Sequence, residues 1–87
     1  MQQPILPSWF KGRQCKAEPA GENALRVSGP NLGEAFLSIR RDADGLWRAA
    51  LRQTPDGPDL AHTEPEITTE QDAWEAAFEL YRNHVIV

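Results

Sequence analysis

Near the end of the chain, apolar side chains recur every three or four positions, which is the spacing of one face of an α-helix. The members of this stripe are Trp74, Ala77, Phe78, Tyr81 and Val85. Thr69 precedes the stripe and suits an N-cap, because its hydroxyl can accept a hydrogen bond from a free backbone N–H. Glu70 and Asp72 add favourable negative charge to the first turn. The pattern predicts an amphipathic helix over residues 69–85.

Upstream of this helix, apolar and polar residues alternate, as they do in strands that are buried on one side only. The alternation is clearest over residues 34–41 and 46–53, and a shorter alternating run covers residues 24–28. Asp44 and Gly45 lie between the two longer runs, and this pair favours a tight hairpin turn. We therefore expect three antiparallel strands in succession.

Two further segments are weaker strand candidates. Residues 11–17 could precede the first strand, and residues 59–64 could form an edge strand because prolines bound them. The segment over residues 18–23 contains Pro, Gly and Asn and is expected to form a loop.

The order of these elements predicts an α+β fold. It consists of an antiparallel three- to four-stranded sheet with one C-terminal α-helix packed on one face, since a half-apolar sheet needs a cover. We expect a single small domain over residues 1–87, with an arm at 1–9, strands and turns at 10–67 and the helix at 69–85. Replacing Trp47 or Phe78 by Ala in the shared core is expected to cost about 3–5 kcal/mol.

The N-terminal arm is apolar although prolines interrupt it. Its candidate contact residues are Ile5, Leu6, Trp9 and Phe10. One interpretation is that the arm folds back and covers an edge of the core. The other interpretation is that it inserts into a partner or a second copy of the chain.

The face of the sheet that the helix leaves uncovered is expected to be basic. By alternation it carries the candidate binding residues Arg26, Phe36, Arg40, Arg48 and Arg52. Long charged side chains often point outward from half-solvated sheets, so solvation alone can explain them. Alternatively, the guanidinium groups bind phosphate or carboxylate while Phe36 stacks on a base or packs on a partner.

Charge is distributed unevenly along the chain. Residues 1–53 contain eight Lys or Arg and five Asp or Glu, whereas residues 54–87 contain one Arg and eight acids. The halves therefore carry +3 and −7, and the whole chain carries −4. An acidic chain is a poor nonspecific binder of nucleic acid unless a local basic patch overrides the average.

Residues able to perform chemistry are few and lack recognisable spacing. Cys15 is the only cysteine, and His62 and His84 are the only histidines. They form no metal-ligand motif, and no serine or cysteine lies in a nucleophile signature. The Asp42–Gly45 segment resembles part of a calcium loop, but the expected flanking strands exclude an EF-hand. We therefore expect no cofactor, no metal and no enzymatic activity.

These features favour a small non-enzymatic interaction or adaptor domain that binds an unknown protein or itself. The alternative is nucleic-acid binding through the arginine-rich face, and an enzyme or metal site is a more distant third. A lone cysteine, no secretory signal pattern and no apolar run of about 20 residues lead us to expect a cytoplasmic protein that does not enter the membrane.

Overall fold

The structure, a computed structural model, describes residues 6–30, 32–64 and 66–85. Two helices and five strands follow one another along the chain. In order they are α1 (Ser8–Gly12), β1 (Lys16–Gly21), β2 (Ala24–Gly29), β3 (Leu32–Arg41), β4 (Trp47–Arg52), β5 (Asp59–His62) and α2 (Glu70–Val85). The described helices include none that is long and apolar enough to cross a bilayer.

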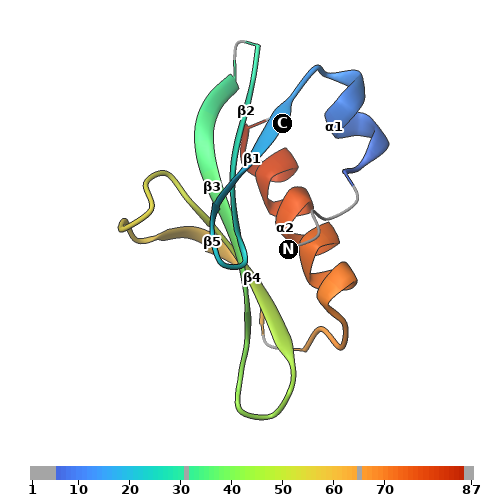
Figure 1. Cartoon of the computed structure of the whole chain (residues 1–87), viewed down its shortest axis with the longest axis vertical. Coiled ribbons are helices and arrows are strands. Elements are labelled where there is room, and N and C mark those ends of the chain that lie inside the picture. The colour runs from blue at the N-terminus through green and yellow to red at the C-terminus, as the bar shows by residue number, and fades with distance from the viewer. Residues whose placement is uncertain (1–5, 31, 65, 86–87) are drawn as a thin grey trace.

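The five strands form one antiparallel sheet in the order β1-β2-β3-β4-β5 (Figure 1). The α+β class and the C-terminal helix are confirmed, but the expected three to four strands become five. β5 lies at an edge, where residues 59–64 were expected to form a strand. The added strand is β1, which occupies much of the predicted 18–23 loop.

Proline and glycine misled the prediction in that segment. Pro19 lies within β1, and β1 is an edge strand, where a missing N–H leaves no ladder partner unsatisfied. The reversal itself is short: Gly21 and Asn23 have φ values of 136° and 57°, which Gly and Asn tolerate better than other residues. The weaker candidate over residues 11–17 is also wrong in its first part, where α1 ends at Gly12.

The β3–β4 hairpin confirms the turn predicted from Asp44 and Gly45. Asp42 Oδ1 accepts hydrogen bonds from the backbone N–H of Asp44 at 3.0 Å and of Leu46 at 3.2 Å. Gly45 has a φ of 82°, in the region that favours glycine. This local network aligns β3 and β4 in register, with Ile39 opposite Ala49.

Helix α2 begins as predicted. Thr69 Oγ1 accepts a hydrogen bond from the Asp72 N–H at 3.1 Å, and the Thr69 carbonyl accepts one from the Ala73 N–H at 3.1 Å. The helix then crosses the sheet, mainly over β3 and β4 (Figure 1). Thr69 therefore ends the connection from the sheet and fixes where the helix starts.

Removing this cap should destabilise the domain modestly. Thr69→Ala leaves a first-turn N–H without its side-chain acceptor, and we expect the free energy of unfolding to fall by about 1 kcal/mol. Chemical denaturation followed by circular dichroism measures the loss. Thr68→Ala is the matched control, because Thr68 is also exposed and should change stability by less than about 0.5 kcal/mol. Equal losses in the two variants would contradict the capping role.

The core lies between the sheet and α2. Its buried apolar residues are Phe10, Cys15, Leu25, Val27, Ala35, Leu37, Ile39, Ala49, Leu51, Ala73, Trp74, Ala77, Phe78 and Tyr81. Trp47 packs against this cluster but is only half-buried, because it lies at the end of β4 beside the hairpin. The loss of unfolding free energy expected for Trp47→Ala is therefore too high. Phe78 is 1% exposed, so the loss of about 3–5 kcal/mol expected for Phe78→Ala is unchanged. The side chain of Val85 lies outside the described part.

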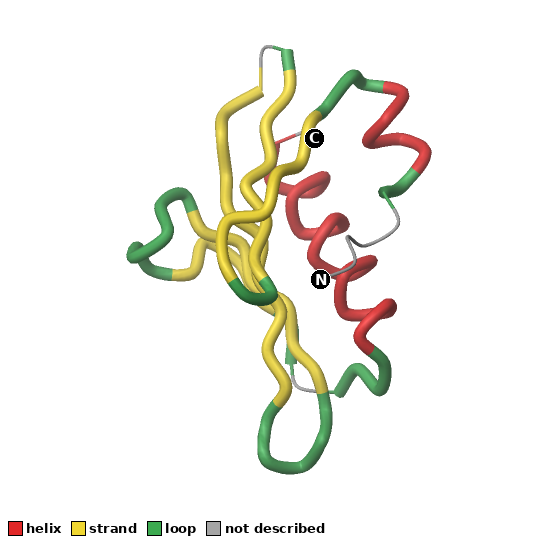
Figure 2. The backbone as a smooth tube through the Cα atoms, viewed as in Figure 1, coloured by secondary structure: helices red, strands yellow, loops and turns green. Residues whose placement is uncertain are grey.

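Helix α1 brings an aromatic from the N-terminal part into this core. The Phe10 ring is 0% exposed and lies edge-on to Phe78, with ring centroids 5.1 Å apart. Tyr81 lies 6.2 Å from the same ring in a tilted arrangement. α1 therefore lies on the same side of the sheet as α2, and the opposite side is free of helices in the described ranges (Figure 2).

Candidate interaction face of the sheet

The side of the sheet away from both helices, called the open face below, carries all five predicted binding residues. Strand alternation places Arg26, Phe36, Arg40, Arg48 and Arg52 on it, together with Ser38 and Ala50. The β4–β5 loop projects beyond the sheet on this same side (Figure 1). The open face is thus a surface of three central strands bordered by a loop.

One row of residues crosses all five strands. Cross-strand pairing aligns Glu18 with Arg26, Arg26 with Phe36, Phe36 with Arg52, and Arg52 with Asp59. The order of charge along this row is acid, base, aromatic, base, acid. Phe36 is half-buried and lies at the centre of the row, with Arg26 and Arg52 at the paired positions of the neighbouring strands.

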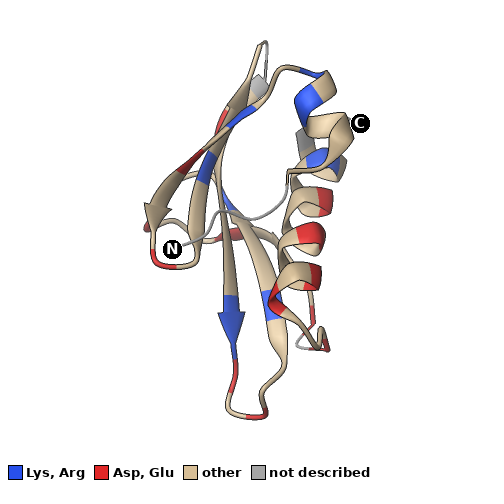
Figure 3. Cartoon of the chain, turned by 45° about the vertical axis from the view of Figure 1, so that its right-hand side comes forward, with Lys and Arg blue, Asp and Glu red and all other residues tan. Residues whose placement is uncertain are grey.

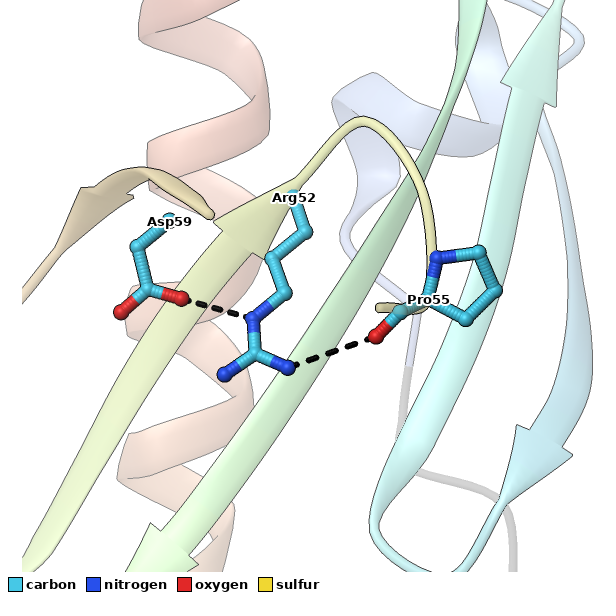
Figure 4. Close-up of polar contacts among 3 residues, drawn as sticks. All are labelled: Arg52, Pro55 and Asp59. Carbon is cyan, nitrogen blue, oxygen red and sulfur yellow. Dashed lines mark hydrogen bonds and ion pairs between the residues drawn. The ribbon is translucent and has the colours of Figure 1, made fainter. Parts of the chain in front are cut away.

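Both arginines of this row are ion-paired. An Arg26 guanidinium nitrogen contacts the Glu18 carboxylate, and the Arg52 Nε donates to Asp59 Oδ1 at 2.7 Å (Figure 4). Arg52 Nη1 also donates to the Pro55 carbonyl at 3.4 Å, so this side chain connects both ends of the β4–β5 loop. These exposed pairs contribute little stability, about 0–1 kcal/mol each, but they neutralise the charge of the row.

Arg40 and Arg48 differ from the other two arginines. They are directly opposite each other on β3 and β4, and the described residues place no carboxylate within 4.0 Å of either guanidinium. Arg48 is half-buried, and its Nε is buried without a hydrogen-bond acceptor in the described part of the chain. The predicted basic face therefore contains two arginines whose charge is balanced by a carboxylate, and two that have no such partner in the described part of the chain.

A small hollow adjoins this pair. It has a volume of about 70 Å³ and is lined by Ser38, Arg40, Arg48, Ala50, Arg52 and Asp59. Ser38 lies opposite Ala50, and these two short side chains leave the space between the arginine pair and the row. Such a volume admits a few water molecules or one small anionic group, and it is too small for a nucleobase.

The opposite side of the molecule is acidic, as the charge distribution predicted. Exposed acids run along the outer side of α2, among them Asp72, Glu75 and Glu79 (Figure 3). Arg82 is the basic residue near the end of this side and lies 3.5 Å from Glu79. Charge is therefore segregated in space as well as in sequence.

The predicted contact residues of the arm divide into three groups. Ile5 lies outside the described residues, and Phe10 is buried in the domain's own core. Leu6 and Trp9 are half-buried and line a groove of about 550 Å³ against α2, whose other wall includes Asp72 and Glu75. Arg82 lies 5.8 Å from the centre of the Trp9 ring, in cation–π range. The interpretation that the arm folds back onto the core explains the burial of Phe10. Contact of Leu6 and Trp9 with a partner stays a prediction.

The candidate chemical residues are not gathered into a catalytic arrangement. Cys15 is buried beside the helices, whereas His62 is exposed on β5 opposite Ala50 and His84 is exposed near the end of α2. Burial raises the pKa of the Cys15 thiol, and Arg13 lowers it to a smaller extent. The thiol is therefore held in its less nucleophilic, protonated form. Within the ranges that the structure covers, no three His, Cys, Asp or Glu side chains cluster as metal ligands.

Tyr81 is the other residue whose pKa is shifted from its ordinary value. Burial raises the pKa of its phenol, and the nearby Cys15 raises it further. Its hydroxyl donates a hydrogen bond to the Gly33 carbonyl at 3.4 Å, linking α2 to the start of β3. Burial thus keeps the Tyr81 phenol protonated, and its hydroxyl joins the helix to the sheet.

The sequence did not predict two acidic residues that pair with arginines of the open face. Glu18 and Asp59 neutralise the arginines of the row, although Glu18 was expected in a loop and Asp59 was not assigned a face. Alternation along β5 could have placed Asp59 beside Arg52 only if the pairing register of β4 and β5 had been known. Comparison of the chain with protein-family models, with curated proteins and with solved structures gave no match.

Proposed function

We propose that the protein is a small non-enzymatic, cytoplasmic interaction domain whose open face binds another protein, with a second copy of the chain as the first partner to test. The central position of Phe36 in the row is the observation that carries this proposal. Aromatic and arginine side chains dominate the binding energy of protein interfaces, especially near their centres. Here a half-buried aromatic lies between two arginines on the side of the sheet that neither described helix covers.

The ion pairs of the row support a protein partner. An interface loses less free energy to desolvation when its charges are already paired and its groups are held in place. Arg26 and Arg52 meet both conditions through Glu18 and Asp59. The acidic side of α2 offers charge complementarity to the remaining Arg40–Arg48 pair if two copies meet.

Sedimentation over a concentration series tests self-association. We expect the mass-average molecular weight to rise above 9.8 kDa at high concentration, and Phe36→Asp to abolish the rise because it places a charge at the centre of the contact. Leu60→Asp is the matched control, since Leu60 is an exposed apolar residue on β5 outside the row. A strict monomer at every concentration would reject self-association, and equal effects of both variants would reject the role of Phe36.

Nucleic-acid binding is the second candidate, and the unneutralised Arg40–Arg48 pair favours it. A phosphate backbone is bound by several cations in succession, and affinity then falls steeply as salt rises. The acids at both ends of the row interrupt such a track, which is why we rank this function second. Labelled single- and double-stranded oligonucleotides at low salt distinguish the two, with loss of binding in Arg48→Glu required for the nucleic-acid function.

A further inference from the structure

Arg40 and Arg48 place two like charges at directly opposite positions of β3 and β4. Like charges at directly opposite positions of an antiparallel pair repel each other. Over the residues described, the ion pairs are Arg26–Glu18, Arg52–Asp59 and Arg82–Glu79, so no carboxylate offsets this repulsion. An anion that bound between the two guanidinium groups would remove it.

Arg48 also has an unused donor. Its Nε is buried and donates to no acceptor among the described residues, although a guanidinium binds a carboxylate best through two parallel N–H groups. A change of rotamer, which is common at interfaces, would turn Nε and one Nη toward a ligand. The hydroxyl of Ser38, which lines the same hollow, can donate a further hydrogen bond.

The rest of the hollow sets the size and charge of the ligand. Its volume of about 70 Å³ suits a single small anionic group. Arg52 already donates to Asp59, and the Asp59 carboxylate on the same wall repels additional negative charge. These features favour one isolated anion over a polyanion.

We propose that the hollow beside Arg40 and Arg48 binds one carboxylate, namely the Asp or Glu side chain of a protein partner. This assignment rests on the proposed function, because it names the polar contact that accompanies Phe36 at the same interface. The carboxylate occupies the hollow and accepts hydrogen bonds from the two arginines, and the apolar part of the partner covers Phe36. Arg26 and Arg52 keep their own acids and take no part in holding the ligand.

A carboxylate from the chain itself must be distinguished from one supplied by a partner. Glu64 and Glu66 lie on the segment beside β4, because Thr63 and Ile67 make backbone hydrogen bonds to Ala49 and Trp47. Neither acid lies within ion-pair distance of Arg48. If one of them moved in to occupy the hollow, Glu64→Gln with Glu66→Gln would increase the affinity for an added carboxylate.

Acetate is the probe for the site. Nitrogen-15 NMR at pH 6 follows the guanidinium and backbone signals while sodium acetate replaces sodium chloride at constant ionic strength. We expect saturable chemical-shift changes at Arg40, Arg48 and Ser38. In Arg48→Gln the affinity for acetate should fall at least tenfold. Arg26→Gln is the matched control because it removes an arginine that is already paired, and it should change the affinity less than twofold.

A second titration identifies the source of the carboxylate. A short peptide with one Glu beside a Leu should bind the wild type at least tenfold more tightly than its Gln counterpart, and Arg48→Gln should remove this preference. Absence of saturable acetate shifts, or equal shifts in Arg48→Gln, would overturn the site. Tighter binding in the Glu64→Gln, Glu66→Gln variant would show that the chain supplies its own carboxylate, and preference for an oligonucleotide over the peptide would assign the pair to phosphate.

The site and the proposed function can fail separately. Acetate binding is measured on dilute protein and does not require association. If the protein binds acetate but stays monomeric and does not bind the peptide, the anion site is supported and the protein interface is rejected. If the protein associates through Phe36 but shows no response to acetate, the interface is supported and the carboxylate site is rejected.

Discussion

Phe78→Ala should lower the free energy of unfolding by about 3–5 kcal/mol. The Phe78 side chain is 1% exposed and contacts the Phe10 ring at the centre of the core between α2 and the sheet. Its removal leaves a cavity as well as a loss of buried apolar surface. Domains of this size have only about 5–15 kcal/mol of total stability, so the variant should be partly unfolded at room temperature.

Urea denaturation followed by circular dichroism measures this loss. Glu75→Ala is the matched control, because Glu75 is exposed on the same helix and the substitution should change stability by less than about 0.5 kcal/mol. A loss below 1 kcal/mol in Phe78→Ala would show that α2 does not pack on the sheet through this residue. Unfolding that begins in both variants at the same urea concentration would lead to the same conclusion.

Phe10→Ala should also cost about 3–5 kcal/mol if α1 unfolds together with the rest of the domain. Phe10 is fully buried and contacts both Phe78 and Tyr81, so it belongs to the same core as the helix. α1 has only five residues, and a helix this short is held by its tertiary contacts rather than by its own hydrogen bonds.

Hydrogen exchange combined with denaturation tests whether α1 unfolds with the domain. We expect protection to fall in α1 and in α2 together in Phe10→Ala, with no change in Lys11→Ala, whose side chain is exposed. If protection falls in α1 alone and global stability changes by less than 1 kcal/mol, α1 is an independently opening segment. That outcome would free Trp9 and Phe10 to contact a partner and would revive the second interpretation of the arm.

The separation of charge between the two sides has a consequence for assembly. The open face keeps two unneutralised arginines, whereas the outer side of α2 carries a row of acids. A contact between these different surfaces is heterologous, so repeated contacts form rings or open chains. Association through two copies of the open face would instead bring Arg40 and Arg48 of both copies together and would need anions at the interface.

Parts of the fold that depend on neighbouring residues were predictable from the sequence. The N-cap at Thr69, the apolar stripe of α2 and the hairpin turn at Asp42–Gly45 all agree with the structure. Each is set by hydrogen bonds or side-chain periodicity within a few residues. The alternation of β3 and β4 likewise identified the open face, since the pleat fixes which residues share a side.

The tertiary structure decided what nearby residues cannot specify. Pro19 is compatible with β1 only because that strand lies at the sheet edge, and an edge position depends on the whole sheet. Phe10 is buried because its ring packs against Phe78 and Tyr81 of α2, which lie far from it in the sequence. Trp47 is half-buried because it lies at the end of its strand, a difference that its alternation with Ala49 and Leu51 did not reveal.

By itself, the sequence therefore determined the α+β class, the C-terminal helix with its cap, and the membership of the open face. Only the tertiary structure decided which of its arginines are paired with a carboxylate. Glu18 and Asp59 reach Arg26 and Arg52 across strands, at separations of eight and seven residues that acquire meaning only once the register is fixed. The same register places Arg40 opposite Arg48, because antiparallel pairing brings together residues whose sequence positions carry no sign of their contact.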